Sequence, residues 1–294
     1  QTGGGLSALK VDGTTGELTL LNRQSTRGAG PCHVSVDRTG RYAMATNYGG
    51  GSIAVFPIQD DGSLAPASDF IQHVGSSVDP RRQEGPHAHS INPDLEHQHV
   101  LVCDLGMDKV LTYRLDRASG KLVAGSQPSV QASPGAGPRH LDYHPNGRFV
   151  YVINEINSTI TAYGYDSERG TLEELQTVPT LPDDFTGSST CADIHVAPSG
   201  RFVYGSNRGH DSLVIYAIEE QTGRLEYVGH ESTHGQTPRN FAITPSGDLL
   251  LAANQDSDNI VVFRVDQKTG RLEPTGQQAD VPTPVCLKFA TLPR

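Results

Sequence analysis

The chain has 294 residues, of which 35% are hydrophobic, and a formal net charge of −10 at pH 7. An acidic surface repels nucleic acid and anionic lipid at long range, and no basic run offsets it, so neither partner is expected. No apolar run of about 18 residues is present, which predicts no membrane span. The four cysteines are scattered without a C-x-x-C pair, which favours a reducing, cytoplasmic location.

A tail of the form Gly-x-Leu recurs along the chain with a period of about 50 residues. Its glycines are Gly16, Gly62, Gly120, Gly170, Gly223 and Gly270. Short runs of β-branched and aromatic residues precede most of these tails, and helical periodicity is nearly absent. Such a period, with about four strands per unit, is typical of propeller blades. The sequence therefore predicts an all-β, single-domain β-propeller over residues 1–294.

About six blade units are detectable along the chain. Residues 6–23 carry only the two outer strands of a blade, so the N-terminal blade is expected to be incomplete. Four-stranded antiparallel blades are expected to begin near Val34, Ser90, Leu141, Ile194 and Phe241. In the third of these, strands are predicted over residues 141–144, 148–153, 159–165 and 171–178. Residues Val285–Phe289 are expected to form an innermost strand that helps to close the ring.

Alignment of the blades brings residues that are distant in the chain to one mouth of the central channel, because the first strand begins where the second ends. A first ring, counted back from the turn glycine, contains Cys32 or His33, His87, Arg139, Ala192 or Asp193, and Arg239. A second ring follows the Asn or Asp that ends each second strand, and contains Tyr48, Leu105, Glu155, Arg208 and Gln255. The framework asparagines repeat and their neighbours do not, so the neighbours are expected to serve a ligand.

Three arginines, a histidine and a glutamate at one mouth predict an anion site with an acid–base group. The arginines Arg139, Arg208 and Arg239 are expected to hold a phosphate or carboxylate through forked hydrogen bonds. Either Glu155 or His87 is expected to move protons or activate water. The alternative is that these arginines form structural ion pairs with Glu155 and acids such as Asp193.

The site is also expected to include four substrate-binding residues, Tyr48, His89, Arg239 and Gln255. The pair His87 and His89 has the H-x-H spacing that can ligate a metal. No third and fourth ligand is in view in the sequence, so no metal is predicted.

Several segments together resemble the lactonase family of seven-bladed propellers, and the resemblance covers nearly the whole chain. They include RQEGPHAHS, GAGPRHLDYHPNGRFVYVINEINSTI, SNRGHDS and TPRNFAITPSG. The family includes a bacterial form of 6-phosphogluconolactonase, an enzyme of carbohydrate metabolism in the pentose phosphate pathway, and a fungal enzyme that cycloisomerises 3-carboxy-cis,cis-muconate. The resemblance implies catalytic roles for His87 in GPHAHS, Arg139 in GPRH, Glu155 in INE and Arg208 in SNR, and a related role for Arg239 in TPRNF.

The resemblance implies a carboxylic-ester hydrolase that acts on a small anionic sugar lactone or related acid, without a metal or another cofactor. The chain is expected to be a monomer or a weak oligomer. Compared with the family, about one blade is absent at the start, so either the chain is shortened or the ring is smaller. Two alternatives stay open: a lactonising cycloisomerase with the same charged residues, and a non-enzymatic protein-binding propeller with a large exposed apolar patch.

Overall fold

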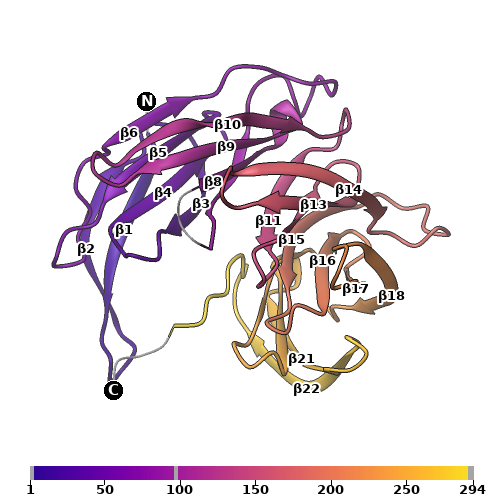
Figure 1. The fold of residues 1–294 in the computed structure, drawn as a ribbon. Coiled ribbons are helices and arrows are strands. Elements are labelled where there is room, and N and C mark those ends of the chain that lie inside the picture. Colours follow the sequence, from indigo (N-terminus) through magenta and orange to yellow (C-terminus); the bar gives the residue numbers. More distant parts are fainter. Residues whose placement is uncertain (1–2, 96–98, 291–294) are drawn as a thin grey trace. The chain divides into compact units, whose positions relative to one another are not determined.

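The computed structural model describes residues 3–95 and 99–290. These residues form five four-stranded antiparallel sheets and one two-stranded sheet (Figure 1), so the predicted all-β propeller architecture is confirmed. The chain divides into two compact units. The first is built mainly from residues before Arg139, together with residues 166–171, and the second from residues 139–165 and 172–289.

The first unit contains one two-stranded and two four-stranded sheets. The two-stranded sheet pairs β1 (Gly5–Val11) with β2 (Leu18–Ser25), which confirms the two lone strands predicted over residues 6–23. The four-stranded sheets contain β3 (Pro31–Val36), β4 (Tyr42–Asn47), β5 (Ser52–Pro57) and β6 (Asp69–Gln72), and then β7 (Ala88–Pro93), β8 (His99–Asp104), β9 (Lys109–Asp116) and β10 (Lys121–Gln131). A short 3-10 helix, Leu105–Met107, follows β8.

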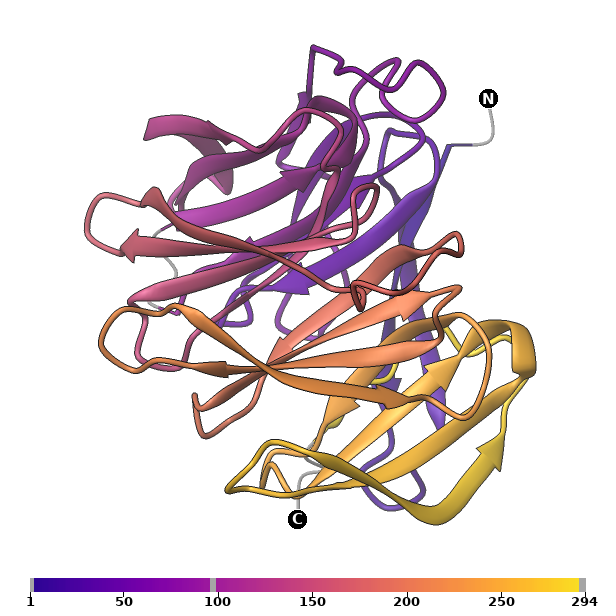
Figure 2. The same cartoon turned by 90° about the vertical axis from the view of Figure 1, so that its right-hand side faces the viewer.

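The second unit contains three four-stranded sheets, and the last two lie side by side (Figure 2). Their strands are β11 (Pro138–Tyr143), β12 (Phe149–Asn154), β13 (Thr159–Asp166) and β14 (Thr171–Pro179), then β15 (Thr190–Val196), β16 (Phe202–Arg208), β17 (Ser212–Ile218) and β18 (Leu225–Ser232), and finally β19 (Pro238–Ile243), β20 (Leu249–Asn254), β21 (Asn259–Val265) and β22 (Leu272–Asp280). A second 3-10 helix, Gln255–Ser257, follows β20.

Neither short helix in the described residues is long or apolar enough to cross a membrane.

The hydrophobic cores lie between neighbouring sheets. In the second unit, Tyr151 and Ile153 of β12 pack with Val203 of β16 and Val214 of β17. All six residues of β12 are buried, as expected for a strand that is covered on both faces. The strand is therefore apolar along its whole length because both of its faces are buried.

The repeated Gly-x-Leu glycine has a left-handed backbone at all six positions, and at four of them, Gly120, Gly170, Gly223 and Gly270, it also lies against an aromatic ring of a neighbouring sheet. Gly223 has φ +70°, and a Cβ atom there would lie 2.3 Å from Phe149. Gly270, with φ +73°, stands in the same relation to Phe202, at 2.4 Å. The left-handed backbone explains why glycine recurs in every tail, and the close approach adds a second reason for glycine at these positions.

Residues Val285–Phe289 form no strand, so the predicted innermost strand is wrong. The Leu287 N–H instead donates to the side-chain oxygen of Asn240 at 2.6 Å, which holds the segment without a backbone ladder. The two-stranded sheet has no inner strands, and its apolar side chains Leu9, Val11, Leu18 and Leu20 are exposed.

Replacement of Gly223 by alanine should destabilise the protein by about 2–4 kcal/mol, because it combines left-handed strain with a clash against Phe149. The matched control is Gly16→Ala, where φ is +76° but a Cβ atom would meet nothing within 4 Å. The control should be destabilised only by the backbone strain, which costs about 1–2 kcal/mol. Thermal midpoints measure both variants, and equal losses would show that the aromatic contact does not matter.

Candidate active site

A buried cluster of three charged side chains lies in the second unit, at the ends of neighbouring strands. Arg139 is at the start of β11, Glu155 directly follows β12, and Arg208 ends β16. Arg139 Nε donates to Glu155 Oε2 at 2.9 Å, and Arg208 Nη2 lies 3.1 Å from the same oxygen. Three predicted catalytic residues thus converge, although 53 residues separate Glu155 from Arg208 along the chain.

The cluster is largely removed from solvent. The side chains of Arg139, Glu155 and Arg208 are 2%, 7% and 14% exposed. Two guanidinium groups and one carboxylate leave an excess of one positive charge, which is costly to bury unless a further anion is present. Burial lowers the pKa of Arg208, Glu155 opposes this shift, and the charge of Arg139 adds to it.

Each of the two arginines also donates to one backbone carbonyl. Arg139 Nη1 donates to the Ala192 carbonyl at 2.6 Å, and Arg208 Nη2 donates to the Cys191 carbonyl at 2.7 Å. The Nε of Arg208 is buried and has no hydrogen-bond partner among the described residues. A buried donor is normally satisfied, so this atom lacks an acceptor that the protein interior usually provides.

The framework asparagines hold these strand ends in place, as their repetition predicts. Asn154 and Asn207 are buried, and their side-chain amides donate to Thr159 Oγ1 at 2.9 Å and to the Thr180 carbonyl at 2.7 Å. Each amide ties the end of a second strand to the chain beside it. These hydrogen bonds fix the backbone at the strand end, and so they fix the position from which the next side chain, Glu155 or Arg208, extends.

In the first unit, His87, Tyr48 and His89 form an aromatic group. His87 stacks on Tyr48 with ring centroids 4.5 Å apart, and His89 meets the same ring edge-on at 5.5 Å. His87 Nδ1 lies 2.9 Å from the Tyr48 carbonyl, so this nitrogen carries the proton in the neutral ring. Its Nε2 then carries the lone pair and lies 3.5 Å from Glu84 Oε1.

The strand register corrects the position of one histidine in the first ring. Pro238 pairs with Asn254 and Asn240 with Ala253, so Arg239 is the extra residue of a β-bulge. Ala88 pairs with Asp104 and Ser90 with Cys103, which makes His89 the equivalent residue. His87, placed in this ring by the repeat alignment, precedes the strand, because its blade lacks the turn glycine used for counting.

Two predicted substrate-binding residues of the second unit stand apart from the charged cluster. Arg239 is half-buried and forms no hydrogen bond or ion pair with a described residue. Gln255 opens the second 3-10 helix and donates to Asp256 at 3.2 Å. Neither side chain bonds to Arg139, Glu155 or Arg208, so their roles stay predictions.

The repeat analysis missed His140, which follows Arg139 directly. His140 Nε2 lies 3.2 Å from Arg139 Nη1, and its Nδ1 lies 2.7 Å from Asp193 Oδ1. A signal was available, because the residue after the bulge position is polar in every full blade. These residues are His33, Ser90, His140, Asp193 and Asn240.

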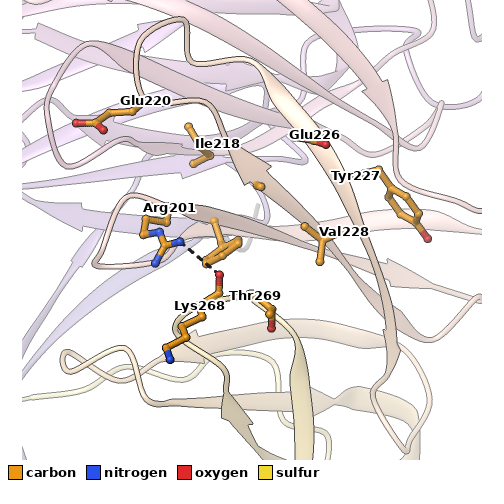
Figure 3. A pocket seen from close by; sticks show the side chains of 10 residues that line it. Arg201, Ile218, Glu220, Glu226, Tyr227, Val228, Lys268 and Thr269 are labelled. Atoms are coloured by element: carbon orange, nitrogen blue, oxygen red, sulfur yellow. Dashed lines mark hydrogen bonds between the residues drawn. The ribbon is translucent and has the colours of Figure 1, made fainter.

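A cavity of about 450 Å³ lies elsewhere in the second unit (Figure 3). Arg201 on its wall donates to the Lys268 carbonyl at 3.3 Å. Its charged side chains, Arg201, Glu220, Glu226 and Lys268, are exposed, so water satisfies them. The buried excess charge around Glu155 makes that cluster the stronger candidate site. Among the described residues, no group of three or more His, Cys, Asp or Glu could hold a metal.

Comparisons with known proteins agree with this architecture. The chain is 41% identical over 286 residues to the 6-phosphogluconolactonase of Bacillus subtilis, with 97% of this chain and 80% of that protein covered. It is 39% identical over 241 residues to an uncharacterized protein of Lactococcus lactis, with 81% and 68% covered.

Among solved structures, the periplasmic gluconolactonase of Pseudomonas aeruginosa superposes with a TM-score of 0.93 at 35% identity. That alignment covers 100% of this chain and 82% of the other. The pattern of the family described as "Lactonase, 7-bladed beta-propeller" matches residues 1–289. The protein therefore belongs to the lactonase family of seven-bladed β-propellers.

Proposed function

We propose that this lactonase hydrolyses a phosphorylated sugar lactone, with 6-phosphogluconolactone as the first substrate to test. The observation that carries the proposal is the buried excess of positive charge around Glu155, together with the unpartnered Nε of Arg208. An anionic substrate would supply the missing charge and the missing acceptor. The Bacillus subtilis relative named 6-phosphogluconolactonase supports the choice of lactone.

In the proposed reaction, water attacks the lactone carbonyl and the ring C–O bond breaks to give the open acid. The two guanidinium groups bind the anionic part of the substrate or the oxyanion that develops on the carbonyl oxygen. Both are held by fixed backbone and carboxylate partners, so little reorganisation is needed when charge develops. The reaction removes one proton from water and delivers one to the leaving oxygen.

Two residues are candidates for the base. Glu155 already accepts from two guanidinium groups through Oε2, and such pairing weakens a carboxylate as a base. In the neutral ring of His87, the Tyr48 carbonyl keeps the proton on Nδ1, so Nε2 carries the lone pair and can accept a proton. His87 lies in the first unit and Glu155 in the second, so each stays a candidate for the base, and Glu155 also holds the arginines. The expected cytoplasmic location stays a prediction.

Arg139→Ala should lower kcat/KM for 6-phosphogluconolactone by about 10²–10³, because it removes one buried cation from the transition state. Far-UV circular dichroism should show that the fold persists, since Glu155 keeps its pair with Arg208. The control is Arg201→Ala on the exposed cavity wall, which should keep the wild-type rate. Unchanged hydrolysis in the Arg139 variant would refute the assignment. A parallel assay with carboxymuconate tests cycloisomerisation.

If His87 is the base, His87→Gln should lower kcat by about 10²–10⁴ with little change in KM, since glutamine can donate to Tyr48 but cannot act as a base. The comparison variant is Glu155→Gln, which should raise KM more strongly because it leaves two guanidinium groups in mutual repulsion. Steady-state kinetics across pH separate the two effects. A large fall in kcat confined to the Glu155 variant would make Glu155 the base.

A further inference from the structure

One buried carboxylate, that of Asp193, has no role in the proposed reaction. It is linked to Arg139 through His140, which contacts both side chains. It is 2% exposed and sits on β15. Its two oxygens face two imidazole rings: Oδ1 is 2.7 Å from His140 Nδ1, and Oδ2 is 3.1 Å from His195 Nε2. The side-chain amide of Asn240 also donates to Oδ2. A carboxylate bound on both oxygens is held rigidly in its ionised form.

His195 carries the positive charge that balances Asp193. Its Nε2 faces Asp193, and its Nδ1 lies 3.6 Å from Asp142 Oδ2, so both ring nitrogens face carboxylates. Burial alone would lower the pKa of His195, but Asp193 and Asp142 raise it to about 10. Burial likewise opposes ionisation of Asp193, and the charge of His195 with the hydrogen bond from His140 holds its pKa well below the usual value.

His140 is the neutral member of this network. Its Nε2 lies 3.2 Å from Arg139 Nη1, and a guanidinium nitrogen can only donate, so Nε2 must accept. The ring proton therefore lies on Nδ1 and is donated to Asp193. Burial and the adjacent charge of Arg139 lower the pKa of His140 to about 4, against the opposing effect of Asp193.

We propose that His140 is a positioning residue for the reaction. Its neutral imidazole is held by the rigid carboxylate of Asp193 and in turn holds the guanidinium of Arg139 in place. This inference rests on the proposed function of Arg139. Three acceptors then define the plane of that guanidinium: Glu155 Oε2, the Ala192 carbonyl and His140 Nε2. A guanidinium held by three acceptors through its Nε and Nη1 atoms keeps its geometry when substrate charge develops.

The charge state of His140 is essential to this role. The groups that face it are Arg139 on its own strand and the Asp193–His195 pair on β15. His195 already pairs with Asp193, and the charge of Arg139 repels a second cation, so His140 is not stabilised as an imidazolium. A protonated His140 would direct an N–H toward Arg139 Nη1 and repel it.

The first test is independent of activity. Protein labelled with ¹⁵N-histidine should show a neutral imidazole with its proton on Nδ1 that titrates near pH 4 and is absent from His140→Gln. A His140 signal that is cationic at pH 7, or protonated on Nε2, would overturn the proposal. This measurement stands even if the wild-type protein has no lactonase activity, in which case the proposed function fails separately.

The second test is kinetic. His140→Phe keeps the ring volume but removes both hydrogen bonds, and should lower kcat/KM about 10–100-fold through a misplaced Arg139. His140→Gln can still donate to Asp193 and accept from Arg139, so it should recover most of that loss. The matched control is His144→Phe, because His144 is a buried histidine directly after the same strand, β11, and bonds to the Gly200 carbonyl at 2.8 Å.

The control should change the thermal midpoint without changing kcat/KM. A His140→Phe variant with wild-type kcat/KM would overturn the proposal. Equal losses of activity in His140→Phe and His140→Gln would also overturn it, because the hydrogen bonds would then not be responsible.

The thermal midpoint of His195→Gln should depend on pH in a defined direction. The folded-state pKa of His195 is raised from 6.5 to about 10, so its stabilising effect is complete below pH 6.5 and disappears as the pH rises through 10. The difference in midpoint between wild type and variant should therefore be largest near pH 6 and shrink toward pH 10. A constant difference would show that His195 does not balance Asp193, which removes one of the reasons for a neutral His140.

Discussion

A single carboxylate oxygen, Glu155 Oε2, is shared by the guanidinium groups of Arg139 and Arg208 inside the second unit. The strong hydrogen bonds hold the three side chains together, while the uneven charge count leaves the site with a net positive charge. The same arrangement fixes the positions of the two guanidinium groups and favours the binding of an anion. A second carboxylate in the cluster would neutralise it and leave a structural ion pair only. The proposed chemistry depends on this imbalance.

The repeated framework makes such a cluster possible. Glycines such as Gly223 allow a turn to lie against Phe149, and buried asparagines such as Asn154 tie each strand end to its neighbour. Such contacts recur in several blades. They do not involve the side chain of the residue after each asparagine, so the type of that residue can differ between blades. Because structural needs are met by the repeated residues, the adjacent positions can carry Glu155 in one blade and Arg208 in the next.

Much of this arrangement was accessible from the sequence. The period of the Gly-x-Leu tails predicted the sheets, and the alignment predicted that Arg139, Glu155 and Arg208 converge. The alignment failed at His87, where a turn without glycine shifted the count and the observed bulge selects His89. The strand expected over Val285–Phe289 also failed, since apolar alternation cannot provide a backbone partner. The contact between His140 and Asp193 was missed because the alignment took only Arg139 from the start of β11 and not the residue that follows it.

The sequence by itself determined the architecture and the identity of the converging charges, because strand periodicity and turn glycines act locally and repeat. Tertiary structure alone decided how those charges are paired and which groups carry protons. Glu155 could have paired with either arginine, and it bonds to both. His140 and His195 are the same residue type beside the same carboxylate, yet their pKa values move in opposite directions. The reason is electrostatic: a proton's free energy depends on charges brought close in space, and their spacing along the chain does not encode it.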